Sequence, residues 1–364
     1  MRTHCFLLFA LLSAGSVQAQ ELACETCGCS PVTGPLQNFY EPGWVIQVNG
    51  QYSSMTTGLD GSQTLANPER QRINSAITQF SAAYNFSQEF GLQLNVPYIN
   101  RDYRRTAGDH LDSGTLAGLG DITLAGRYTP VAQFDSDRSL VWNLQLGLKL
   151  PTGSATALKE ELGHLAPPSN SGGSSAATDS HSDKFSDPVL FHGGHEHEPV
   201  EEPEEAAAPA SAPELPESLV GGHDLALGSG SVDGVIGTSL FLREKSFFLG
   251  AGAQYLLRTR GAYGYQFGNA FLWNFSPGVL FVRDDEQYLG LQLNVNGEIK
   301  QQDNIQGLRI DHTGMNAIYA GPQFFASSED LNFLGGVDFP LSQHTDGATL
   351  VPDYRIRVQM NWKL

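Results

Sequence analysis

The chain has 364 residues, of which 16% are charged, against roughly 25% in a typical soluble domain. Its formal net charge of −18 disfavours nucleic acid as a partner, because phosphate backbones attract basic surfaces. Its 4 cysteines all lie among the first 29 residues and cannot form a disulfide framework, so an extensive sheet is the expected stabilising structure.

Residues 1–19 have the pattern of a secretory signal peptide. A basic start at Arg2 precedes an apolar run from Cys5 to Leu12, and small residues lead to a cleavage site after Ala19. The run is too short to cross a bilayer as a helix, and no later segment offers the roughly 18 consecutive apolar residues that a helical span needs. We therefore expect an exported protein without a helical anchor.

Residues 20–42 form the expected periplasmic N-terminal segment, which carries Cys24, Cys27 and Cys29 in the spacing C-x2-C-x-C. Three thiolates are soft ligands that suit Cu(I), Zn²⁺ or an iron–sulfur centre. A disulfide with one thiol left over fits the same spacing. The sequence leaves both interpretations open.

Alternation of apolar and polar residues with period two predicts strands. In residues 139–151, SLVWNLQLGLKLP, one face carries leucines and Trp142, and the other carries Asn143, Gln145 and Lys149. Clear alternation also covers 44–54, 90–98, 289–300 and 354–364, and weaker alternation covers 73–86, 120–129, 231–243, 246–258, 267–281, 314–326 and 331–341. The pattern predicts twelve strands.

Three features favour a membrane barrel over a soluble sheet. The polar faces carry Asn, Gln, Gly, Ser and Thr rather than Lys and Glu, many strands reach the roughly 9–11 residues that tilted spans need, and short connections alternate with long ones. Short connections are expected near 85–89, 129–138, 243–246, 283–287 and 327–330, and long ones at 55–72, 100–119, 151–230, 259–266, 301–313 and 342–353. We therefore predict an all-β fold, a twelve-stranded antiparallel transmembrane β-barrel over residues 43–364, surrounded by the lipid of a Gram-negative outer membrane.

Three short motifs carry a family resemblance. Residues 118–128 read GLGDITLAGRY, residues 148–153 read LKLPTG, and residues 226–237 read ALGSGSVDGVIG. Their order resembles the outer-membrane family named for the meta-pathway of phenol degradation. The resemblance implies a transporter-like barrel for small organic compounds. From the residues themselves, the glycines and Asp121 are expected to shape a turn, and alternation turns Asp121 and Asp233 toward the lumen.

The longest connection, 151–230, holds six of the ten histidines and most of the acidic excess. Residues 151–222 contain 13 acidic and 2 basic residues, so we expect 152–226 to be a disordered, acidic, His-rich extracellular loop. His192, His195 and His197 stand among glutamates and form a candidate zinc or copper site, with a solvated polar loop as the alternative. No other cofactor is expected.

The inward polar positions of the clearest strands are the candidate pore lining. They are Asn143, Gln145, Lys149, Gln292, Asn294, Glu298, Arg355, Arg357 and Gln359. On the same lumen face, Arg355 and Arg357 would favour anionic solutes, unless such charges pair with one another and stiffen the barrel. Twelve strands should leave a narrow lumen, between the filled interior of eight and the open channel of sixteen.

No catalytic motif is present, with no Gly-x-Ser-x-Gly elbow, no His-Glu-x-x-His and no phosphate loop, so we predict no enzyme. The main hypothesis is an outer-membrane channel that lets small organic solutes diffuse passively through a narrow polar lumen. One alternative is a metal-handling barrel that uses the His-rich loop and the cysteines. A second alternative is an adhesin-like barrel that displays the loop at the cell surface.

Overall fold

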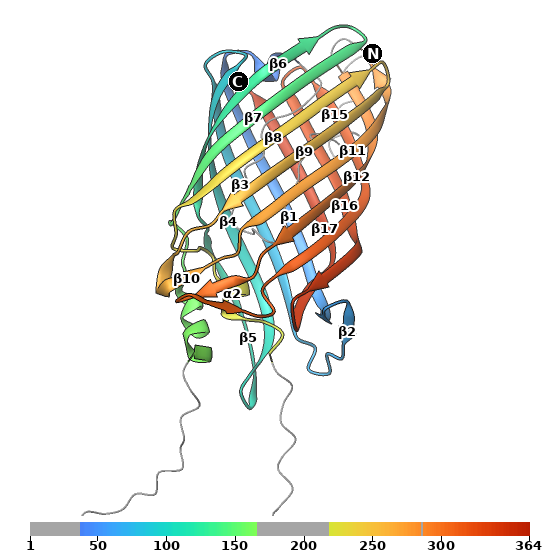
Figure 1. The fold of residues 1–364 in the computed structure, drawn as a ribbon. Coiled ribbons are helices and arrows are strands. Elements are labelled where there is room, and N and C mark those ends of the chain that lie inside the picture. The colour runs from blue at the N-terminus through green and yellow to red at the C-terminus, as the bar shows by residue number, and fades with distance from the viewer. Residues whose placement is uncertain (1–36, 166–217, 285–286) are drawn as a thin grey trace, which may run out of the picture. The chain divides into compact units, whose positions relative to one another are not determined.

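The computed structural model describes residues 37–165, 218–284 and 287–364. In these residues, twelve long antiparallel strands form a barrel (Figure 1). The strands are β1 (Gly43–Asp60), β3 (Arg72–Asn85), β4 (Phe90–Ala107), β6 (Ile122–Phe134), β7 (Arg138–Leu150), β8 (Asp233–Glu244), β9 (Phe247–Leu257), β11 (Ala270–Arg283), β12 (Gln287–Lys300), β15 (Met315–Ser328), β16 (Leu331–Thr345) and β17 (Thr349–Lys363). Each pairs with its neighbour in the chain, and β17 pairs with β1 from Val45–Lys363 to Leu59–Thr349. The predicted fold class is confirmed.

The two faces of each strand differ as the alternation predicts. On β7, Leu146 is 68% exposed and Leu148 is 56% exposed, whereas Asn143 and Lys149 are fully buried. A closed barrel buries only its inner face, so the apolar side chains form the outer surface and the polar ones enclose the lumen. This is the arrangement of a barrel surrounded by lipid.

Short turns and long connections lie at opposite rims. The connections β3–β4, β6–β7, β8–β9 and β15–β16 are tight turns, and the chain enters β1 and leaves β17 at this same rim, which we call the short-turn rim. There the backbone N–H of Leu364 donates to the carbonyl of Trp44 over 2.9 Å. The opposite rim, the loop rim, carries the smaller elements (Figure 1). These are β2 (Gln63–Leu65), β5 (His110–Leu119), η2 (Thr156–Leu165), α2 (Gly222–Leu225), η3 (Ala262–Gly264), β10 (Tyr265–Gln266), β13 (Asp303–Ile305) and β14 (Leu308–Ile310).

Three of the predicted long loops consist mostly of strand residues. In 55–72, β1 runs on to Asp60 and β2 pairs back onto it. Residues 100–119 belong mostly to strands, because β4 runs on to Ala107 and β5 pairs back onto it. Residues 342–353 are also mostly strand, with three residues between β16 and β17. A strand that projects beyond the apolar band is no longer required to alternate, so its sequence resembles that of a loop.

The prediction of a disordered segment over 152–226 is wrong at both ends. Residues 156–165 form η2 and residues 222–225 form α2, while residues 166–217 lie outside the described part. Leu219, Val220 and Leu225 are buried against Met55 and Leu350 of the barrel wall. This segment has few apolar residues of its own, but they become buried because they pack against apolar residues of the barrel wall.

Pairing between β16 and β17 stops halfway along the wall. It runs from Leu331–Trp362 to Asp338–Arg355, and beyond that point β17 continues to pair with β1 alone. The backbone N–H of Leu350 donates instead to the carbonyl of Leu219 over 3.2 Å. Pro340 and Pro352 lie in the unpaired halves and have no N–H to donate.

In the described ranges, no helix has the length and apolar character that a membrane span requires.

Candidate functional site

The lumen is the candidate site, and all nine predicted pore-lining side chains lie in it. They come from β7, β12 and β17 and are all buried. Most contact other inward side chains: the Gln292 amide donates to Gln323 over 2.7 Å, and that of Gln359 donates to Asn361 over 3.0 Å. Their assignment to a solute path remains a prediction.

The two lumen arginines are each paired with a carboxylate. Arg355 lies 3.4 Å from Glu298, and its guanidinium stacks 3.6 Å from the centre of the Tyr319 ring. Arg357 lies 3.3 Å from Asp338, which also accepts a hydrogen bond from Asn294. Because each charge is balanced locally, this pair of arginines gives the middle of the lumen little net preference for anions.

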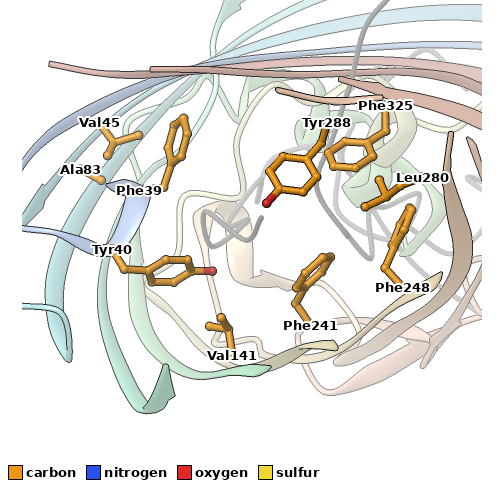
Figure 2. Close-up of a cluster of buried hydrophobic side chains, with 10 residues drawn as sticks. All are labelled: Phe39, Tyr40, Val45, Ala83, Val141, Phe241, Phe248, Leu280, Tyr288 and Phe325. Atoms are coloured by element: carbon orange, nitrogen blue, oxygen red, sulfur yellow. The ribbon is translucent and has the colours of Figure 1, made fainter. Parts of the chain in front are cut away.

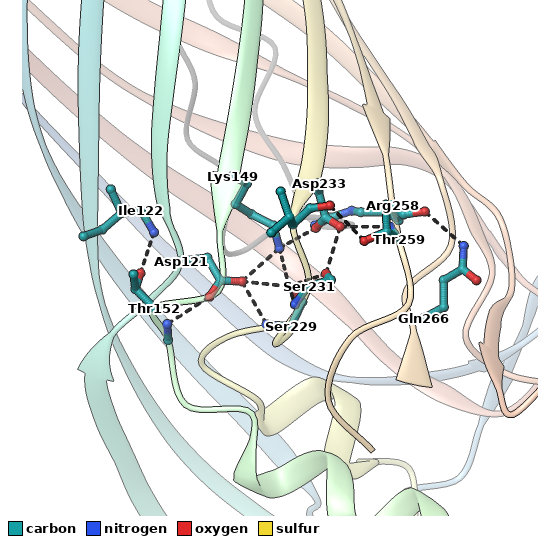
Figure 3. A network of polar contacts seen from close by, with 12 residues as sticks. Asp121, Ile122, Lys149, Thr152, Ser229, Ser231, Asp233, Arg258, Thr259 and Gln266 are labelled. Carbon is teal, nitrogen blue, oxygen red and sulfur yellow. Dashed lines mark hydrogen bonds and ion pairs between the residues drawn. The ribbon is translucent and has the colours of Figure 1, made fainter. Parts of the chain in front are cut away.

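A second charged network joins the motif residues at the loop rim (Figure 3). The Lys149 ammonium lies 2.9 Å from Asp121 and 2.6 Å from Asp233, and Asp233 is also 3.0 Å from Arg258. The Ser229 hydroxyl and backbone N–H both donate to Asp121. The network therefore ties the ends of β6, β7, β8 and β9 to the segment that returns from the long connection. Asp121 and Asp233 are buried and face inward, as alternation indicates.

The two ends of the long connection that the structure describes lie at the loop rim, and we call residues 154–162 and 218–229 the inner plug. Arg101 of β4 donates to the carbonyl of Ala226 over 2.5 Å. Arg105 pairs with Glu160 at 2.6 Å and with Asp112 at 3.1 Å. Two arginines of one strand thus hold the two halves of the plug.

His223 is the buried centre of the inner plug. Its Nδ1 lies 2.9 Å from Glu161 Oε1 and its Nε2 lies 3.4 Å from Asp224 Oδ1. Burial lowers the pKa of His223, but Asp224 and Glu161 together outweigh this effect and raise it to about 9. His223 is therefore protonated at neutral pH, and its ion pair with Glu161 connects α2 to η2.

Two cavities meet at this histidine. The outer cavity, of about 810 Å³, is lined by Asp60, Arg105 and the outer side of the inner plug. The inner cavity, of about 100 Å³, extends toward Lys300. Both are lined by His223, Asp224, His312 and Thr349, so these residues form the partition between them. The rings of His223 and His312 are 6.1 Å apart.

At the short-turn rim the inner face is apolar rather than polar (Figure 2). We call six buried residues the aromatic collar: Phe39, Tyr40, Phe241, Phe248, Tyr288 and Phe325. Phe39 and Tyr40 come from η1 (Gln37–Tyr40), which Asn85 fixes by donating to the carbonyl of Phe39 over 2.9 Å. A Cβ on residue 278 would lie 2.2 Å from the Phe248 ring, so Gly278 leaves the space that this ring occupies.

The sequence prediction of a narrow polar lumen did not include the collar. Its signal was present in the register, because Phe241 shares the inward face of β8 with Asp233 and Ser239. A large apolar residue on a polar face, close to a short turn, indicates an apolar inner surface at that rim.

The proposed metal ligands lie outside the described residues. His192, His195 and His197 fall within residues 166–217, and Cys24, Cys27 and Cys29 fall within residues 1–36. In the described residues, no cluster of three or more His, Cys, Asp or Glu side chains is arranged to hold a metal ion. The metal prediction therefore stays a prediction.

No protein-family profile and no curated protein sequence matches the chain. Among solved structures, an outer membrane channel from Pseudomonas putida F1 is similar, with a TM-score of 0.52 and 9% identity over 89% of this chain and 96% of that one. A FadL homologue from Pseudomonas aeruginosa aligns over 93% of this chain and 96% of its own, with 9% identity and a TM-score of 0.38. At this identity the first likeness shows the fold alone. The resemblance to the phenol meta-pathway family stays a prediction.

The band of exposed apolar side chains on the outer surface indicates where in the cell the protein lies. Outward leucines and aromatic residues cover consecutive strands, as with Leu146 on β7, Ile236 on β8 and Leu291 on β12. An antiparallel barrel with an even number of strands, short turns at one rim and an outward apolar band is the architecture of bacterial outer-membrane proteins. The chain is an outer-membrane β-barrel of a Gram-negative bacterium.

Proposed function

We propose that the protein is an outer-membrane channel through which small organic compounds diffuse passively. The observation that carries this proposal is the arrangement of the lumen. Cavities lie at the loop rim, hydrogen-bonded amides and paired charges fill the middle, and the aromatic collar surrounds the lumen at the short-turn rim.

The aromatic collar supports organic molecules over hydrated ions as the solutes. An inner surface lined by Phe241, Phe248 and Phe325 offers no hydrogen bonds to replace an ion's water shell, and apolar surfaces in a narrow pore oppose ion flow by dewetting. A molecule with apolar surface gains contact with the rings instead. Arg127 and Arg243 lie 5.2 Å from the Tyr40 ring and 5.6 Å from the Tyr288 ring, which leaves polar groups next to the apolar ones.

Reconstitution in planar bilayers and liposomes tests the proposal. We expect low potassium chloride conductance together with swelling of proteoliposomes in small neutral organic solutes such as arabinose, but not in sucrose. Phe248→Ser should raise ion conductance several-fold because it wets the collar. Phe247→Ser is the matched control, since Phe247 is 71% exposed on the outer face of the same strand. Absence of solute permeation, with equal conductance in both variants, would refute the channel.

A further inference from the structure

One lumen cation near the short-turn rim differs from the arginines in the middle of the barrel. Arg127 of β6 donates to the side-chain oxygens of Thr129 and Asn85, with 2.8 Å between its Nη2 and Asn85 Oδ1. Its guanidinium lies 5.2 Å from the centre of the Tyr40 ring. These partners are an alcohol, an amide and a phenol, all of them neutral, and within the described residues Arg127 takes part in no ion pair.

The fold gives this guanidinium a defined place beside the aromatic collar. Gly91 faces Arg127 across the pairing of β4 with β6, and a Cβ at residue 91 would lie 3.1 Å from Arg127 Nη2. Asn85 is itself fixed, because its amide nitrogen donates to the carbonyls of Phe39 and Glu41 over 2.9 and 3.1 Å. The amide oxygen of Asn85 is thereby turned toward Arg127 and holds the cation next to η1.

The accessible part of Arg127 faces the lumen. Arg127 shares the inward face of β6 with Thr123 and Thr129, which are buried. Arg127 itself is partly buried, whereas Arg355 and Arg357 in the middle of the lumen are buried. A solute that crosses the barrel can therefore approach this guanidinium directly.

Carboxylates balance the other lumen cations more closely. Lys149, Arg355 and Arg357 each lie within 3.4 Å of a carboxylate. Near the collar, Arg243 of β8 resembles Arg127, because it donates to two turn carbonyls and to the hydroxyl of Ser139, all neutral groups. A cation without a paired carboxylate attracts anions and repels cations, and it does so more strongly inside a protein than in water.

We propose that Arg127 makes the lumen selective for organic anions over organic cations at the aromatic collar. The proposal rests on the channel function and names the class of solute that the channel favours, small molecules with an apolar body and one negative charge. The apolar body contacts the rings of the collar. The anionic group is attracted by Arg127 as it passes.

Efflux from proteoliposomes that contain the full-length barrel tests this selectivity. The probes are benzenesulfonate and phenyltrimethylammonium, which both have one aromatic ring, carry opposite permanent charges and cross lipid very slowly. We expect the anion to leave at least about tenfold faster than the cation, because an unbalanced charge in the lumen acts through a lower dielectric constant than that of water. Arg127→Gln should reduce this ratio below about threefold, whereas Arg127→Lys keeps the charge and should preserve the preference.

Asn143→Asp is a second, nearly isosteric variant that keeps the arginine. Asn143 accepts a hydrogen bond from Thr129 over 2.8 Å, and Thr129 accepts one from Arg127, so the new carboxylate would balance the cation without removing it. It should lower the ratio as Arg127→Gln does. Arg138→Gln is the matched control, since Arg138 pairs with Glu244 and its side chain is 72% exposed.

Equal efflux of the two probes from the native barrel would overturn the selectivity. An unchanged ratio in either Arg127→Gln or Asn143→Asp, whichever folds, or an equal drop in Arg138→Gln, would overturn it as well. A barrel that passes arabinose but does not distinguish the probes keeps the channel and loses this inference. Passage of neither arabinose nor either probe would refute the channel and this inference together.

Discussion

Lys149 and Asp233 form a buried ion pair, with 2.6 Å between the ammonium and the carboxylate. The same ammonium lies 2.9 Å from Asp121, and the three side chains come from β7, from β8 and from the position directly before β6. A cation between two buried carboxylates offsets a repulsion that would otherwise separate these strands. The network around this pair reaches the inner plug through Ser229, which donates to Asp121 and accepts a hydrogen bond from Lys149.

Removing that cation should destabilise the barrel. Lys149→Met leaves Asp121 and Asp233 facing one another, and breaking a buried pair in this way costs about 3–5 kcal/mol. Urea unfolding of the barrel in detergent should show this loss. Lys159→Met, at an exposed position, should change stability by less than about 0.5 kcal/mol. Similar losses for both substitutions would contradict a structural role of the pair.

The ion pair between His223 and Glu161 predicts a pH range over which the stability of the protein changes. The pKa of His223 is raised to about 9, whereas the unfolded value is about 6.5, so its stabilisation is complete below pH 6.5 and is lost as pH rises through 9. This pKa shift can contribute at most about 3 kcal/mol to the free energy of unfolding. The groups that face the ring are Glu161, Asp224, Asp303 and His312.

The stability difference between the native chain and His223→Gln should therefore shrink between pH 6.5 and pH 9.5. Unfolding midpoints measured at several pH values would show the change directly. A difference that stays constant over this range would mean that His223 is neutral when folded.

The Arg355–Glu298 pair predicts the ion selectivity of the residual conductance. Glu298→Gln leaves the Arg355 charge without its carboxylate, so the reversal potential in a potassium chloride gradient should shift toward chloride. Glu244→Gln is the matched control, because Glu244 pairs with Arg138 at an exposed site. If both variants keep the native reversal potential, the solute path does not pass Arg355.

The sequence alone predicts the strands of the barrel wall, but it does not predict the inner plug or the side-chain pairs inside the barrel. Alternation predicts which side chains face lipid within the apolar band, as β7 and β12 show. The inner plug could not be predicted, since Leu219 and Leu225 become buried only against residues such as Met55 that are far away in the chain. The partners of Arg355 and Lys149 likewise lie on other segments, and alternation along one strand does not show which inward side chains meet.

The interrupted pairing between β16 and β17 predicts a local weakness in the wall. Amide hydrogens of residues 339–344 that point toward β17 should exchange faster than those of residues 331–338, which pair with it. Hydrogen exchange of the barrel in lipid nanodiscs, read by mass spectrometry, measures both segments in one experiment. Uniform protection along β16 would show that the wall is continuous in solution.

The central claim is that leucines contact lipid while amides enclose a lumen, and cysteine accessibility on β7 tests it most directly. In a chain whose native cysteines are changed to serine, Cys would replace Leu144, Gln145, Leu146 or Asn143 in turn, in liposomes. We predict that labels at 144 and 146 are quenched by brominated lipid, and that residues 143 and 145 are not quenched and react only with small aqueous reagents. Lipid quenching at 143 and 145, or at none of the four positions, would contradict the account.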